Sequence, residues 1–124
     1  MDSKTVQLTV PAEAPFARIV RMTAASLAAT CDMGVDDVED VRMAAEEGFV
    51  YACATGPAAC SVEFSVSCDE VVMDFSLGAN VDAADEDESL GLVEALLSAI
   101  CDESLVTEDG AFLRLVKRTG GAHE

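Results

Sequence analysis

The stretch Asp36-Asp37-Val38-Glu39-Asp40-Val41-Arg42-Met43-Ala44-Ala45-Glu46-Glu47-Gly48-Phe49-Val50-Tyr51-Ala52 has the periodicity of an amphipathic helix. Its apolar residues recur at steps of three and four and predict one buried stripe of Val38, Val41, Ala45, Gly48 and Ala52. Asp36 or Asp37 is placed to cap the first turn. Glu47 and Tyr51 lie one turn apart, so both could face a metal, a water or a nucleotide. An exposed helical glutamate is, however, more often part of a solvated face.

The composition describes one folded domain with a strong acidic excess. The 124 residues, of which 51% are hydrophobic, can form a single core. We therefore expect one domain, residues 1–124, with a polar tail at 118–124. Twenty-four acidic residues against seven basic ones give a net charge of −17, which works against binding nucleic acid or an anionic membrane. Neither a signal peptide nor a membrane span is visible, which predicts a cytoplasmic protein.

The cysteines do not have the spacing of a metal site. There are five of them, widely separated and without a Cys-x-x-Cys pair, and the single histidine, His123, is next to last. Zinc sites need closely spaced ligands. We therefore predict no metal site from cysteine or histidine, and we expect the thiols to be small apolar core residues. They are Cys31, Cys53, Cys60, Cys68 and Cys101.

The remaining sequence divides into short segments with strand or helix periodicity. Predicted strands cover residues 5–10, 61–66, 71–75, 104–107 and 111–116, and predicted helices cover 13–30, 36–53 and 89–101. A charged, unpatterned loop is expected at 77–88. This order predicts an α/β (α+β) two-layer sandwich, with a mixed, mostly antiparallel sheet of about five strands and three helices on one face.

Two segments carry a resemblance to a known family. Val10-Pro11-Ala12 followed by Pro15-Phe16-Ala17-Arg18-Ile19-Val20-Arg21-Met22 is similar to the start of the anti-sigma-factor serine-protein kinases of the RsbW and SpoIIAB type, which are GHKL ATPases. The stretch from Glu47 to Ala52 resembles that family's Glu-Ala-x-x-Asn-Ala motif. The resemblance covers nearly the whole chain and implies the Bergerat-type ATP-binding fold.

The resemblance also implies roles for individual residues. Glu47 would be the catalytic base, and Tyr51 stands where the family has its magnesium-binding asparagine. A phenol is a poor magnesium ligand and its ring would fill the space of the ion. The first helix of the family contacts its protein partners, which points to Arg18 and, less directly, to Arg21.

Two further nucleotide-binding motifs are each altered. The family's Asp-x-Gly-x-Gly appears as Asp74-Phe75-Ser76-Leu77-Gly78, in which Asp74 would accept a hydrogen bond from adenine and Gly78 would lie beside the base. The family's phosphate-binding Gly-x-Gly loop appears as Ser89-Leu90-Gly91, preceded by acidic residues only. The family also has a threonine on its last strand that reaches the base, and this chain has Ala111 and Phe112 near that position instead. The resemblance thus implies ATP and magnesium as cofactors that are bound weakly or not at all.

These features lead to three functional hypotheses. The first is an anti-sigma-factor-like regulator, a pseudokinase that sequesters a sigma factor or a related partner. The second is an active ATP-dependent serine-protein kinase that phosphorylates an anti-anti-sigma factor, with Glu47 and Asp74 preserved. The third is an acidic subunit of an unrelated assembly that shares only the fold. A homodimer is compatible with the family resemblance.

Overall fold

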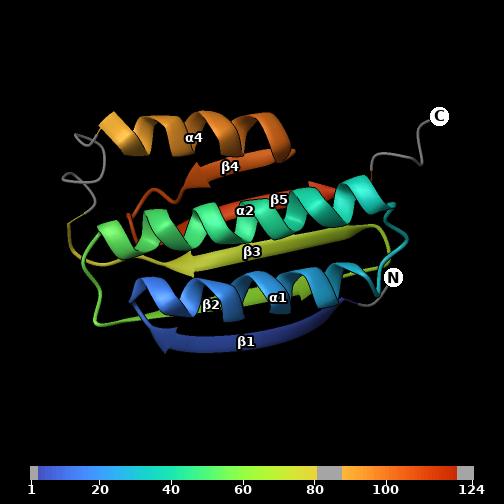
Figure 1. The fold of residues 1–124 in the computed structure, drawn as a ribbon, viewed down its shortest axis with the longest axis horizontal. Coiled ribbons are helices and arrows are strands. Elements are labelled where there is room, and N and C mark those ends of the chain that lie inside the picture. The colour runs from blue at the N-terminus through green and yellow to red at the C-terminus, as the bar shows by residue number, and fades with distance from the viewer. Residues whose placement is uncertain (1–2, 81–87, 120–124) are drawn as a thin grey trace.

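The computed structural model describes residues 3–80 and 88–119, which form one antiparallel sheet covered by helices (Figure 1). Strand and helix periodicities in the sequence account for most of these elements. The strands are β1 (Lys4–Pro11), β2 (Ala59–Val66), β3 (Glu70–Ser76), β4 (Glu103–Val106) and β5 (Phe112–Arg118). The helices are the 3-10 helix η1 (Ala14–Phe16) and the α-helices α1 (Ala17–Ala28), α2 (Val35–Ala54) and α4 (Glu88–Ile100).

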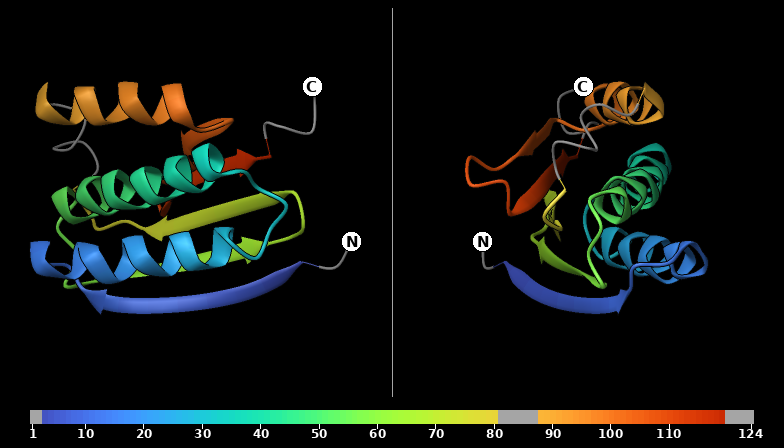
Figure 2. Two further views of the ribbon diagram at one scale, coloured as in Figure 1. Left: turned by 45° about the vertical axis from the view of Figure 1, so that its right-hand side comes forward. Right: turned by 90° about the vertical axis from the view of Figure 1, so that its left-hand side faces the viewer.

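The five strands have the spatial order β1-β2-β3-β5-β4, and every neighbouring pair is antiparallel. The α-helices lie together on one face of this sheet and leave the other face open (Figure 2). The predicted two-layer α+β arrangement of five strands and three helices is therefore confirmed. The prediction of a mixed sheet is wrong for the described residues, in which no parallel pair occurs, because hairpins form the β2–β3 and β4–β5 pairs.

Strand alternation separates the two faces of the sheet. In β3, Val71, Met73 and Phe75 are fully buried beneath the helices. Residues between them project to the open face, since successive side chains of a strand point in opposite directions. An antiparallel sheet tolerates one solvated face, so polar residues at these alternate positions cost little.

The central helix α2 lies between α1 and α4 (Figure 1). Val41, Ala45, Gly48 and Ala52 of the predicted stripe are buried, as expected, and Val38 is half-buried. The buried arc is wider than predicted because α2 contacts a helix on either side as well as the sheet beneath it. This wider arc also buries Ala44, Phe49 and Tyr51.

The prediction that Asp36 or Asp37 caps α2 is wrong. Gly34 occupies the cap position, without a side-chain hydrogen bond, and the helix starts at Val35. Asp36 and Asp37 are instead in the first turn, where their negative charges interact favourably with the helix dipole.

The predicted first helix, residues 13–30, is divided and shorter than expected. Pro15 lies in η1, and the α-helix begins only at Ala17. Val20, Ala24 and Ala28 form its buried side, whereas Ile19, which shares the helical spacing of the apolar residues in this segment, is 45% exposed. The small alanine side chains let α1 pack closely against α2.

The last helix and the last strand also differ in detail from the prediction. Leu90, Val93 and Leu97 are buried residues of α4, while Leu92, which shares the helical spacing of the apolar residues in this segment, is 75% exposed. Strand β5 continues to Arg118, so the predicted tail at 118–124 begins too early. Residues 120–124, and residues 81–87 of the predicted acidic loop, lie outside the described residues.

The five cysteines are free thiols. Cys60 is fully buried, as predicted, while the other four are only half-buried. Burial raises the pKa of the Cys60 thiol to about 12, because the thiolate would lose its hydration. Across the part of the chain that the structure describes, no helix combines the length and the apolar character needed to cross a membrane.

Candidate functional site

Glu47 and Tyr51 occupy different environments on α2. The Tyr51 side chain is 1% exposed and belongs to the hydrophobic core. Glu47 lies half-buried at the margin of this core. Burial raises the pKa of the Glu47 carboxyl, and the negative charge of Glu46 raises it further. The pair predicted to face one ligand is therefore divided between the core and the surface.

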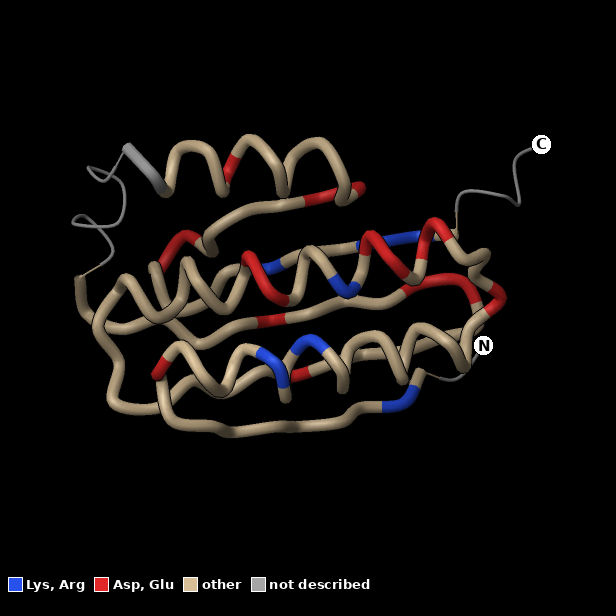
Figure 3. Tube along the Cα trace, viewed as in Figure 1, with Lys and Arg blue, Asp and Glu red and all other residues tan. Residues whose placement is uncertain are grey.

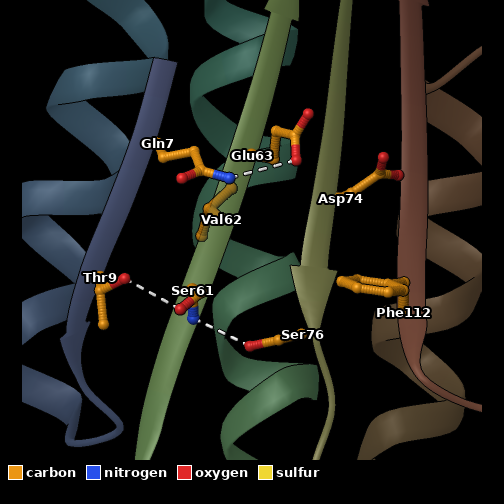
Figure 4. A pocket seen from close by; sticks show the side chains of 8 residues that line it. All are labelled: Gln7, Thr9, Ser61, Val62, Glu63, Asp74, Ser76 and Phe112. Atoms are coloured by element: carbon orange, nitrogen blue, oxygen red, sulfur yellow. Dashed lines mark hydrogen bonds between the residues drawn. The ribbon is translucent and has the colours of Figure 1, made fainter. Parts of the chain in front are cut away.

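Asp74 lies on the open face of the sheet, opposite to the helices (Figure 4). Its two carboxylate oxygens accept hydrogen bonds from Arg114, at 2.8 Å from Nε and 3.0 Å from Nη2. The strand register explains this pair, because Asp74 and Arg114 are direct cross-strand neighbours. The sheet thus separates the predicted adenine acceptor from Glu47 and Tyr51.

Gly78 packs against the end of α2. Its backbone N–H donates a hydrogen bond of 2.6 Å to Oγ1 of Thr55, which is itself fully buried. A Cβ at Gly78 would lie 2.4 Å from the Thr55 carbonyl oxygen and 2.7 Å from the Pro57 nitrogen. A glycine is needed here because two backbone segments meet, so the packing alone explains why position 78 is a glycine.

The residues predicted to bind phosphates lie at the beginning of α4. Ser89 is in the first turn of this helix, and Gly91 follows on an exposed position. No atom lies within 4 Å of a Cβ built on Gly91, so packing does not require a glycine there. The start of α4 is not close to Asp74, because α4 lies on the helical side of the sheet and Asp74 projects from the other side (Figure 2).

The residues present do not fit a magnesium-bound nucleotide. Tyr51 places a phenol ring in the core at the position of the family's metal-binding amide. Among residues 3–80 and 88–119, no group of three or more His, Cys, Asp or Glu side chains is arranged to hold a metal ion. The Asp74 side chain faces away from the helices and forms an ion pair with Arg114. We therefore derive no reaction step through ATP or magnesium.

Arg18 and Arg21, the predicted partner-binding residues, also differ in their surroundings. Arg21 Nη1 forms an ion pair of 3.1 Å with Oε1 of Glu46 on α2. Arg18 is exposed, and no described carboxylate lies within 4.0 Å of it. Five of the seven cations, in contrast, form ion pairs between described residues. Figure 3 shows the basic segment of α1 beside the acidic segments of α2.

An apolar groove of about 300 Å³ lies between the start of α1 and the end of α2, and Ala17, the residue before Arg18, is one of its lining residues. Phe49 and Cys53 line it together with Val50, which is 41% exposed. The expected elements do not include this groove. Two features of the sequence point to it: Pro15, which divides the first helix, and Val50, an apolar residue outside the stripe of α2. The remaining lining residues are Ala14 and Glu46.

Comparison with known proteins does not identify a family. No protein-family model matches the chain, and no curated protein is significantly similar to it in sequence. The resemblance to anti-sigma-factor kinases therefore stays a prediction from its motifs.

Proposed function

We propose that the protein is an anti-sigma-factor-like regulator that sequesters a sigma factor or a related protein in the cytoplasm, without kinase turnover. The ion pair between Asp74 and Arg114 supports the absence of kinase turnover, because it engages the predicted adenine acceptor on the face of the sheet opposite to the helices. The buried phenol of Tyr51 gives independent support. Both observations argue against use of the scaffold for phosphoryl transfer.

The surface around Arg18 has the chemistry of a protein-binding site. The apolar groove can receive an apolar side chain of the partner, and the exposed guanidinium of Arg18, the residue after Ala17 of the groove, can pair with a carboxylate of the partner. Met22, one turn after Arg18 on α1, adds an exposed apolar side chain on the same side of this helix. Aromatic and aliphatic anchors in such pockets, with Arg beside them, commonly dominate binding energy.

Binding measured with each purified sigma factor of the source organism tests this proposal. We expect one of them to bind the immobilised protein, and Arg18→Glu to weaken that binding at least about tenfold, as for removal of an interface charge pair. Lys4→Glu is the matched control, because Lys4 is an exposed cation of β1 that, like Arg18, forms no ion pair with a described residue, and this change should leave affinity unchanged. If no sigma factor binds, or both variants weaken binding equally, the proposed surface is wrong.

One observation favours the second hypothesis, an active serine-protein kinase. The raised pKa of Glu47 would suit a general base. Incubation with magnesium, labelled ATP and an anti-anti-sigma factor tests it directly. Label transferred to a serine, and lost in Glu47→Gln, would establish the kinase. Absence of label would leave the raised pKa of Glu47 as a consequence of burial and of the neighbouring Glu46 charge.

A further inference from the structure

A second cavity lies on the open face of the sheet, on the other side of the molecule from Arg18 and the apolar groove. It has a volume of about 290 Å³ and spans β1, β2, β3 and the start of β5 (Figure 4). This is near the lower limit for small-molecule sites. The cavity plays no part in the proposed function, so its ligand is a separate question.

Hydroxyl groups form the lower part of this cavity. Oγ atoms of Thr9 and Ser61 are 2.9 Å apart, and either can be the donor. One hydrogen serves that bond, so the pair keeps a second hydroxyl hydrogen and acceptor capacity for a ligand. Ser76 Oγ accepts a hydrogen bond of 2.9 Å from the Ser61 backbone N–H. The cross-strand register places these three short side chains in one row.

An amide and a carboxylate form the upper part. Gln7 Nε2 lies 3.4 Å from Oε1 of Glu63, which is longer than the usual 2.7–3.2 Å of such a bond. The Gln7 amide thus has further donor and acceptor capacity, and the Glu63 carboxylate has acceptor capacity. Both side chains are exposed and point towards each other across the strands (Figure 4).

The ring of Phe112 forms an apolar side wall. It is 43% exposed, although an aromatic ring gains by burial. Figure 4 shows the ring beside Ser76, at the edge of the hydroxyl row. The cavity therefore presents one apolar surface next to hydrogen-bond donors and acceptors, and a ligand with both an apolar face and hydroxyl groups would match this combination.

The charges of the cavity select among ligand classes. No Lys or Arg is among its lining residues, and Arg114 beside it is engaged by Asp74, so an anionic ligand would find no free cation. An ammonium ligand would use the acceptors but leave the hydroxyl and amide donors unmatched. Ligand hydroxyls both donate and accept, and they match the whole set.

We propose that this cavity binds a neutral sugar ring, with its apolar C–H face against Phe112 and its hydroxyls on the Gln7–Glu63 pair and the Thr9–Ser61 pair. Twelve or so non-hydrogen atoms on an open surface give a dissociation constant of the order of 1 mM. Such an affinity is suited to a ligand present at high concentration, or to a sugar that belongs to a larger molecule.

Titration of the ¹⁵N-labelled protein, followed by NMR, tests the proposal. The probes are D-glucose, D-ribose and myo-inositol as neutral ligands, glucose 6-phosphate as the anion and cadaverine as the amine. We expect at least one neutral probe to shift the backbone amides of Ser61, Ser76 and Phe112 and to bind better than the two charged probes. Absence of binding by all three neutral probes, or preference for a charged one, would overturn the proposal.

Two variants locate the binding and a third serves as control. Phe112→Ala should weaken sugar binding about threefold to tenfold, the effect of removing an aromatic contact. Glu63→Gln should weaken sugar binding by less than about tenfold while abolishing any binding of cadaverine, because only the amine needs the charge. Ser65→Ala, which changes a residue of the same face outside the cavity, should bind as the unaltered protein does. Equal affinity in Phe112→Ala and Ser65→Ala would refute the proposed pose.

Discussion

Arg114 donates two hydrogen bonds to the two carboxylate oxygens of Asp74, across neighbouring strands of the sheet. This bidentate geometry fixes both side chains and is stronger than a single charged contact. It also gives Asp74 a structural role on the face opposite to α2. The aspartate predicted to recognise a base therefore acts as half of a cross-strand ion pair.

A double-mutant cycle measures this ion pair. Arg114→Met and Asp74→Asn should each lower the free energy of unfolding by about 0.5–1 kcal/mol, a range set by solvent screening of a half-exposed pair. Their effects should not add, because both remove the same interaction. Urea denaturation of the two single variants and the double variant gives the coupling energy. The Glu39–Arg42 pair within α2 is the comparison, and its coupling should be smaller because both side chains are solvated.

The two glycines of the predicted nucleotide motifs should respond oppositely to alanine. Gly78→Ala forces a Cβ to within 2.4 Å of a backbone oxygen, so we expect a loss of about 2 kcal/mol or more. Gly91→Ala adds a Cβ in open space on a helix, and we expect a gain of up to about 1 kcal/mol. Thermal and urea denaturation of both variants checks this. A stable Gly78→Ala protein would mean that the contact with Thr55 is not as close as described.

Tyr51→Asn, which reintroduces the family's metal-binding residue, should destabilise the protein without producing ATP hydrolysis. The change removes a fully buried ring and places an amide in the core, at a cost of about 3 kcal/mol. Tyr51→Phe keeps the ring and should cost much less. Strong ATP hydrolysis by the asparagine variant would show that the remaining nucleotide-binding residues are intact after all.

Glu47→Gln should stabilise the protein at neutral pH. The pKa of Glu47 is raised in the folded protein, so its charged form is disfavoured there and native stability falls as pH rises through that pKa. The neutral glutamine avoids this loss. Its advantage should be present at pH 7 and disappear as pH falls below the unfolded value of about 4.3, where both proteins are neutral at this position. Since Glu47 is only partly buried, the effect is small.

The neighbouring Glu46 provides the control for this pH dependence. Its carboxylate pairs with Arg21, so Glu46→Gln removes an attraction and should lower stability at neutral pH. Urea titrations of both variants between neutral and acidic pH compare them. A stabilising effect of Glu47→Gln that did not change with pH would exclude ionisation as its cause.

The strands and the two-layer arrangement were predictable because alternation along a strand reflects burial directly. The same rule also predicts the face of the sheet on which Asp74 lies. Val71, Met73 and Phe75 form the buried side of β3, so a residue between them must face away. The resemblance of Asp74-Phe75-Ser76-Leu77-Gly78 to a nucleotide-binding motif predicts the opposite orientation, and here the strand alternation is the better guide.

The burial of Tyr51 was not predictable in the same way. The apolar stripe of α2 does not show how many neighbours the helix has, and α1 and α4 enclose it from both sides. Leu92 and Ile19 are exposed, although each recurs at the helical spacing of the apolar residues in its segment. Spacing along a helix indicates which residues share a face but does not say how wide the covered arc is.

Isothermal titration with ATP and magnesium tests most directly the central claim that this scaffold binds a protein and not a nucleotide. The separation of Asp74 from Glu47 and Tyr51 by the sheet predicts no heat of binding, or a dissociation constant weaker than about 1 mM. A dissociation constant in the micromolar range would contradict the account, since it would require a nucleotide site that includes Asp74, Glu47 and Tyr51 on the same side of the sheet.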